Sequence, residues 1–135
     1  MATIAKELKK ESRGGHDPRE VKTVRDWIKL LKSEGEFREV DAKVDWDCEI
    51  GTIARYCMSA KNGVALQFNN IRDHANTWCR KLFTNSVSSY GRFNLAFGLP
   101  KDAGRKELIL KMKEGYNRTL APKEVSTADC KQNIL

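Results

Sequence analysis

The sequence lacks any apolar run of the roughly 20 residues that a membrane-spanning helix needs. It also lacks a secretory signal, because charged side chains interrupt the few apolar residues near the start, between Lys6 and Glu11. We therefore expect a soluble, cytoplasmic protein with no membrane partner. Its 135 residues suffice for one compact domain with a buried core, but they are few for an enzyme that encloses a large cofactor.

Residues that bind metals or form disulfides are scarce and scattered. The cysteines are Cys48, Cys57, Cys79 and Cys130, and they form no CxxC pair, which suits reduced thiols better than a disulfide framework. The two histidines, His16 and His74, lie far apart in expected loops, so the convergent ligands of a zinc site are missing. We expect structural cysteines, solvent-exposed histidines and no metal in this chain.

The net charge of +7 raises the question of nucleic-acid binding, which depends on how the charge is distributed. Basic and acidic residues number six and four in residues 1–22, eleven and nine in 23–100, and eight and five in 101–135. The excess is thus spread as +2, +2 and +3, without a basic stripe or an aromatic platform for bases. Such a pattern favours an ordinary solvated surface over a nucleic-acid partner.

What the sequence does contain is an ordered succession of helix and strand patterns. The first is a helix over residues 24–34, which begins with a capping box of Thr23 and Asp26 and stops at Gly35. Alternating apolar and charged residues then predict a short strand in the stretch EFREV, residues 36–40, which leads to Val44. The chain before this helix is charged and rich in turn-forming residues, so we expect residues 1–22 to be a flexible or peripheral arm.

The middle of the chain predicts another helix and a pair of strands. The helix is expected to take Asp45 as its N-cap and to end near Gly63. Its apolar face would consist of Trp46, Ile50, Ile53, Ala54 and Cys57. Two runs over residues 64–68 and 78–84 have the length of strands and are expected to pair with each other.

The last third predicts two further helices. A brief one is capped by Ser88 or Ser89 and closed by Gly98, and its apolar residues are Phe93, Leu95, Ala96 and Phe97. The final helix, over residues 103–118, would turn four side chains inward, namely Leu108, Ile109, Met112 and Tyr116. This order predicts an α/β (mixed α+β) domain, with a small sheet of about three to four short strands packed with three to four helices.

Four acidic residues gather around the expected start of the second helix, and they are Asp41, Asp45, Asp47 and Glu49. Paired carboxylates can act as general acid and base, but a helix N-terminus also attracts acids through its dipole, and we favour that interpretation. Cys57 lies on an apolar helix face with no base beside it, so it is interpreted as a small core residue.

The segment from Ser86 to Arg92 is the most suggestive of a binding site. Serines and backbone N–H groups at a helix start, with an arginine one turn in, have the chemistry to hold an anion. The interpretation we favour is a capped helix whose arginine pairs with an acid on a neighbouring element. The residues alone therefore predict no catalytic, cofactor-binding or metal site.

Five segments, in order along the chain, carry a resemblance to a known family. They are residues 23–40 (TVRDWIKLLKSEGEFREV), 44–55 (VDWDCEIGTIAR), 63–71 (GVALQFNNI), 82–99 (LFTNSVSSYGRFNLAFGL) and 122–135 (PKEVSTADCKQNIL). Together they resemble the N-terminal domain of UbiD-type decarboxylases. The sequence departs from the family pattern at Val64, where proline is usual, and at Asn69, where glutamate is usual.

The resemblance implies more chemistry than this chain contains. Family members reversibly decarboxylate aromatic or α,β-unsaturated carboxylic acids with prenylated FMN, a divalent metal, typically Mn²⁺, and K⁺, and the modified flavin serves as the electron sink. The domain that binds these cofactors and supplies the Glu-Arg-Glu network follows the N-terminal domain. No catalytic residue of the family can be placed on this sequence, and no cofactor is expected in this chain alone.

The resemblance also suggests how the chain is organised. Residues 23–120 would form the UbiD-like N-terminal α/β domain, and residues 121–135 would begin a connector to a cofactor-binding domain that is missing here. The expected partners are that domain and the C-terminal domain of a larger enzyme that forms homo-oligomers. Two alternatives remain, a natural small non-catalytic subunit of a multi-subunit carboxylase and a basic nucleic-acid-binding module.

Overall fold

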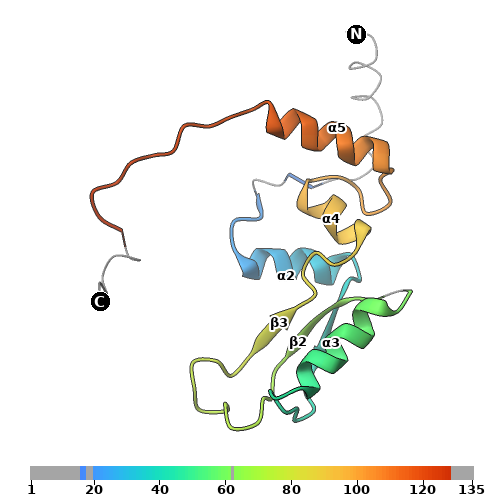
Figure 1. The fold of residues 1–135 in the computed structure, drawn as a ribbon, viewed down its shortest axis with the longest axis vertical. Helices are drawn as coiled ribbons and strands as arrows, with labels where there is room; N and C mark the ends of the chain where they lie inside the picture. The colour runs from blue at the N-terminus through green and yellow to red at the C-terminus, as the bar shows by residue number, and fades with distance from the viewer. Residues whose placement is uncertain (1–15, 18–19, 62, 129–135) are drawn as a thin grey trace.

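The computed structural model describes residues 16–17, 20–61 and 63–128, and its centre is a three-stranded sheet in the order β1-β2-β3 (Figure 1). The strands are β1 (Phe37–Val40), β2 (Ala65–Phe68) and β3 (Leu82–Thr84). β1 runs parallel to β2 with Phe37 opposite Ala65, and β3 runs antiparallel to β2 with Leu82 opposite Phe68. In the described part of the chain the sheet is accompanied by α2 (Val24–Ser33), α3 (Glu49–Ser59), α4 (Tyr90–Ala96) and α5 (Arg105–Tyr116). The expected α+β class is confirmed.

Helix α2 forms where its local signals predict it. The Asp26 N–H donates to Thr23 Oγ1 at 3.2 Å, and the Thr23 N–H donates to Asp26 Oδ2 at 3.1 Å, which completes the capping box. Gly35 follows the helix with φ of +70°, a conformation that glycine adopts at little cost. The helix buries Trp27 and Leu31 against the rest of the core.

The start of α3 differs from the prediction, because Asp45 is not its N-cap. Cys48 takes that position with φ of 63°, and its side chain makes no capping bond. Asp45 Oδ1 instead accepts from the Asp47 N–H at 3.0 Å and closes a tight turn before the helix. Trp46 lies in this turn and is mostly exposed, so it is not part of the apolar helix face.

Two other elements are shorter than expected. Helix α3 ends at Ser59 rather than near Gly63. The strand expected over residues 78–84 pairs only from Leu82 onward, while Trp78 is fully exposed in a region of turns. Phe68, the last residue of β2, lies opposite Leu82, so the residues before Leu82 have no strand to pair with.

The core consists of two apolar clusters that share β2. Because successive side chains of a strand point to opposite faces, Ala65 faces one side of the sheet while Leu66 and Phe68 face the other. The α2-side cluster contains Trp27, Leu31, Phe37, Ala65 and Leu95. The α3-side cluster contains Val44, Ile50, Leu66, Phe68 and Ile71. Helices therefore cover both faces of the sheet.

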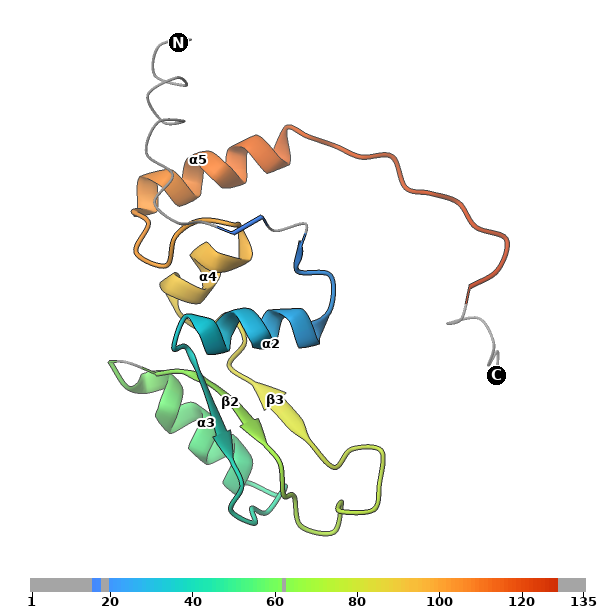
Figure 2. The same ribbon diagram turned by 180° about the vertical axis from the view of Figure 1, so that it is seen from behind.

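Helices α4 and α5 lie beyond α2, on the side away from the strands (Figures 1 and 2). Ser89 caps α4 as expected, since its Oγ accepts from the Arg92 N–H at 3.2 Å, but Ala96 is exposed rather than buried. The expected inward face of α5 is wrong for three of its four residues. Leu108 is buried, whereas Ile109, Met112 and Tyr116 are 62%, 42% and 87% exposed.

Residues 118–128 contain no helix or strand, and the chain leaves the body of the domain after α5 (Figure 2). Most of the expected 1–22 arm and the last seven residues, with Cys130, lie outside the described residues. None of the helices that the structure describes is both long and apolar enough to cross a bilayer.

Candidate functional site

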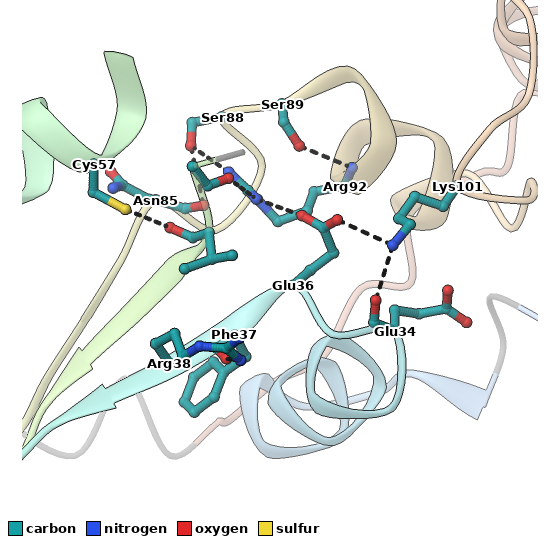
Figure 3. A network of polar contacts seen from close by, with 12 residues as sticks. Glu34, Glu36, Phe37, Arg38, Cys57, Asn85, Ser88, Ser89, Arg92 and Lys101 are labelled. Atoms are coloured by element: carbon teal, nitrogen blue, oxygen red, sulfur yellow. Dashed lines mark hydrogen bonds and ion pairs between the residues drawn. The ribbon is translucent and has the colours of Figure 1, made fainter. Parts of the chain in front are cut away.

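The segment singled out by sequence, from Ser86 to Arg92, ends in a buried arginine that makes several polar contacts (Figure 3). Arg92 Nη1 donates to Glu36 Oε2 at 2.8 Å and to the Gly63 carbonyl oxygen at 2.8 Å. Arg92 Nη2 donates to Ser88 Oγ at 3.0 Å. The guanidinium thus connects α4 to the segments that lead into β1 and β2.

A second cation completes the surroundings of Glu36. Lys101 Nζ lies 3.2 Å from Glu36 Oε1 and donates to the Glu34 carbonyl oxygen at 2.9 Å. The loop that carries this lysine is held in turn by Asn94, whose Nδ2 donates to the carbonyl oxygens of Lys101 and Ala103 at 3.2 and 2.9 Å. One carboxylate therefore anchors both α4 and the loop that leads to α5.

This geometry leaves Arg92 unavailable to an external anion. Its side chain is 1% exposed, and its charge faces the carboxylate of Glu36. The favoured interpretation, an arginine paired with an acid on a neighbouring element, is confirmed. Two buried atoms, Arg92 Nε and Asn94 Oδ1, have no hydrogen-bond partner within the described ranges.

The acidic residues near α3 are used in local structure rather than as a carboxylate pair. Asp45 forms an ion pair with Arg72, and its backbone N–H donates to Glu49 Oε2 at 2.6 Å. Asp41 Oδ1 accepts from Asn69 Nδ2 at 2.8 Å. Glu49 is the acid in the first turn of α3, as the helix dipole favours.

The histidines are partly buried, so the expectation that both are solvent-exposed is wrong. His74 Nδ1 lies 3.2 Å from Thr77 Oγ1, and its ring meets Trp46 edge-on with centroids 6.3 Å apart. The Cys57 thiol donates to the Val64 carbonyl oxygen at 3.5 Å, which fits a structural cysteine. Within residues 16–17, 20–61 and 63–128, no three His, Cys, Asp or Glu side chains gather as metal ligands.

A smaller polar cluster lies on the α2 side of the sheet, around Glu39. Lys32 Nζ donates to Glu39 Oε1 at 2.6 Å, and Asn69 Nδ2 donates to Glu39 Oε2 at 3.1 Å. The hydrogen bonds from Lys32 and Asn69 hold the pKa of the Glu39 carboxyl below its ordinary value. A low pKa suits a permanently charged surface group better than a proton donor near neutral pH.

An open pocket of about 270 Å³ lies between the start of α2, the loop before α4 and α4 itself. Trp27 forms part of its wall and donates from Nε1 to Ser86 Oγ at 2.9 Å, and Leu95 and Val21 supply apolar surface. Among the described residues, His16 lines the pocket, but no lysine or arginine does. These described residues offer no permanent positive charge to a flavin phosphate, so they do not fit a prenylated FMN site.

Sequence reasoning missed the partners of Arg92. Glu36 and Lys101 were not singled out as candidate residues, although both form ion pairs in this network. The available signal was a carboxylate directly after the glycine that ends α2. That position gives no indication of which distant cation it meets, because Arg92 is 56 residues away.

Comparison with known proteins identifies the fold and the family. Residues 28–112 match the 3-octaprenyl-4-hydroxybenzoate carboxy-lyase N-terminal domain, UbiD_N. The chain is 34% identical over 95 residues to ferulic acid decarboxylase 1 of Candida dubliniensis, a match that covers 63% of this chain and 18% of that protein.

The fold is also that of a solved decarboxylase chain. Vanillic acid decarboxylase of Sedimentibacter hydroxybenzoicus superposes with TM-scores of 0.67 in its open form and 0.69 in its closed form. In both, the identity is 24%, and the match covers 83% of this chain and 24% of that one. The chain thus spans about a fifth to a quarter of these relatives. It belongs to the UbiD carboxy-lyase family, and it contains that family's N-terminal domain.

Proposed function

We propose that this chain is the non-catalytic N-terminal domain of a UbiD-type enzyme that reversibly decarboxylates aromatic or α,β-unsaturated carboxylic acids. The observation that carries this proposal is the match of residues 28–112 to the N-terminal domain of the carboxy-lyase family. The relatives that it matches are themselves decarboxylases of ferulic and vanillic acid.

The way the polar side chains are used supports this non-catalytic role. Arg92, Glu36 and Lys101 are bound to one another and to backbone carbonyl groups. The acids near α3 hold turns, and the described residues that line the pocket beside α2 include no lysine or arginine. A catalytic carboxylate or arginine must be free to meet substrate, and these groups are not.

The cofactors of the proposed enzyme, prenylated FMN, Mn²⁺ and K⁺, are therefore assigned to another part of the enzyme. That part lies on the same polypeptide or on a partner subunit. In this proposal, the domain packs against the cofactor-binding part of the enzyme. It also contributes to the contacts between subunits of the oligomeric enzyme.

The test compares the 135-residue chain with the same chain joined to, or mixed with, the cofactor-binding part of the enzyme. Each sample is incubated with prenylated FMN and Mn²⁺, desalted, and assayed for flavin absorbance and for CO₂ release from a panel of aromatic and α,β-unsaturated acids. We expect flavin retention and turnover only in the sample that contains the cofactor-binding part.

Two results would contradict the proposal in different ways. Stoichiometric flavin retention by the chain alone would show that the domain itself holds the cofactor. Absence of CO₂ release in a cofactor-loaded complex, across the whole panel, would show that the parent protein is not a decarboxylase.

A further inference from the structure

The outer surface of α5 carries an apolar stripe, which we define as Ile109, Met112 and Tyr116. Successive residues of a helix are about 100° apart, so these side chains and the buried Leu108 lie within one sector of about 100°. All three are exposed, at 62%, 42% and 87%. A helix that turns most of its apolar face to water has an unused contact surface.

The direction of this stripe is fixed by the rest of the domain. Asn94 is 2% exposed and binds the carbonyl oxygens of Lys101 and Ala103, just before the helix begins. At the first turn of α5, the Gly104 N–H donates to Glu107 Oε2 at 3.3 Å. Leu108 then inserts into the domain, so the stripe is presented on a helix that is anchored at its N-terminal end.

Two further apolar side chains beyond the helix are also exposed. Leu120 and Val125 are 86% and 50% exposed, in a segment without helix or strand that leaves the body of the domain (Figures 1 and 2). The match to the family's N-terminal domain ends at Met112, in the middle of the stripe. These exposed apolar residues therefore lie on both sides of the point where that match ends.

The charges around the stripe indicate the chemistry of its partner. Residues 105–118 contain five basic side chains and two acidic ones, and the basic ones are Arg105, Lys106, Lys111, Lys113 and Arg118. One of the two acids, Glu114, is already paired with Lys111 at 3.1 Å. A second copy of this chain would bring the same positive rim against itself, which is unfavourable. A partner with an apolar centre and an acidic rim is complementary.

We propose that the α5 stripe and the segment that follows it form the docking surface for the remaining part of a UbiD-type carboxy-lyase. The receiving site is an apolar groove bordered by aspartate and glutamate side chains, on the same polypeptide or on a separate subunit. This inference rests on the proposed function, and it adds the residues through which the domain joins the enzyme.

The test uses the full protein in the cells that produce it, with a photo-reactive benzoylphenylalanine in place of Tyr116. Leu110 supplies the matched control position, because it is as exposed as Met112, at 42%, but lies on the opposite side of α5. After irradiation, the cross-linked peptides are sequenced by mass spectrometry. The yield at position 116 is then measured again with Met112→Glu and with Leu110→Glu.

We expect cross-links from position 116 to an apolar, acid-rich peptide of a carboxy-lyase, and at least about fivefold fewer from position 110. Met112→Glu is expected to lower the yield at position 116 by about tenfold, because it would bring a negative charge into the apolar centre and toward the acidic rim of the partner, whereas Leu110→Glu changes it by less than about twofold. Both substitutions are on exposed positions, so the fold of the domain is unaffected.

The other outcomes separate the two proposals. Equal cross-linking from positions 110 and 116 to a carboxy-lyase would overturn the docking surface and leave the proposed function intact. Cross-links to a second copy of this chain, or none at all, would also overturn the surface. Cross-links to nucleic acid or to a protein of another class would overturn the surface and count against the carboxy-lyase function as well.

Discussion

Arg92 shows how a single buried cation ties separate parts of a small domain together. Removing a guanidinium from water costs several kcal/mol, which is repaid only where opposite charge and acceptors surround it. Glu36, Ser88 and the Gly63 carbonyl oxygen supply those acceptors from three places in the chain. The residue is therefore a structural anchor, although its position at a helix start suggested an anion site.

Arg92→Met is expected to lower the free energy of unfolding by about 3–5 kcal/mol, because it leaves Glu36 and the Gly63 carbonyl oxygen without their main donor. The control is Lys32→Met, which breaks the more exposed pair with Glu39 and should cost about 0.2–1 kcal/mol. Urea unfolding followed by circular dichroism measures both. Equal urea midpoints for the two variants would mean that the buried ion pair contributes no more to stability than the exposed one.

At the scale of single residues, sequence predicted what kind of partner Arg92 has but not which one. The capped helix and the pairing with an acid followed from local chemistry. The identity of Glu36 depends on how α4 folds back over the sheet, which is a tertiary property. The same limit applies to Asp45, whose ion pair with Arg72 no local pattern revealed.

At the scale of elements, α2 is the clearest case of a helix determined by its own ends. The hydrogen bond from the Thr23 hydroxyl is the largest cause that holds the pKa of Asp26 below its ordinary value of 3.8. A carboxyl group whose pKa is lowered in the folded state stabilises the folded state when the pH is above the ordinary pKa of the group. That stabilisation disappears as the pH falls through the lowered value.

Asp26→Asn is therefore expected to lower the urea midpoint at pH 7, and the difference from the unaltered protein should shrink as the pH falls below about 3.8. Thr23→Ala should raise the pKa of Asp26 toward its ordinary value, as measured by NMR titration of the carboxyl carbon. A midpoint difference that stays constant down to the lowest pH would show that the cap does not depend on the charge of Asp26.

The elements that sequence predicted well are those with local signals, and the errors arise where distant contacts decide. Capping residues and Gly35 placed α2 within one residue of its observed end. The strand expected over residues 78–84 was too long because β2 ends opposite Leu82. The inward face expected for α5 was wrong for Ile109, Met112 and Tyr116, and of its four residues only Leu108 is buried.

At the scale of the whole molecule, β2 joins the two halves of the core, so the domain should unfold as one unit. Phe68→Ala on the α3 side is expected to cost about 3–5 kcal/mol. Trp27 reports from the α2 side, once the exposed Trp46 and Trp78 are replaced by phenylalanine. Its fluorescence transition should shift by as much as the circular dichroism transition.

Leu82→Ala is the control for this substitution, since Leu82 lies opposite Phe68 but is 39% exposed, and its cost should be clearly smaller. If the Trp27 signal kept its original midpoint in the Phe68→Ala variant, the two clusters would be independent folding units.

The division of the core between two faces also sets an order in time during synthesis. Every residue of the α3-side cluster, from Val44 to Ile71, has been made once the ribosome passes Ile71. The α2-side cluster is complete only after Leu95 has been made, and Arg92 is made only slightly before Leu95. Chains emerge N-terminus first and at a limited rate. The residues of the α3-side cluster can therefore pack on their face of the sheet while the α2-side cluster still lacks Leu95.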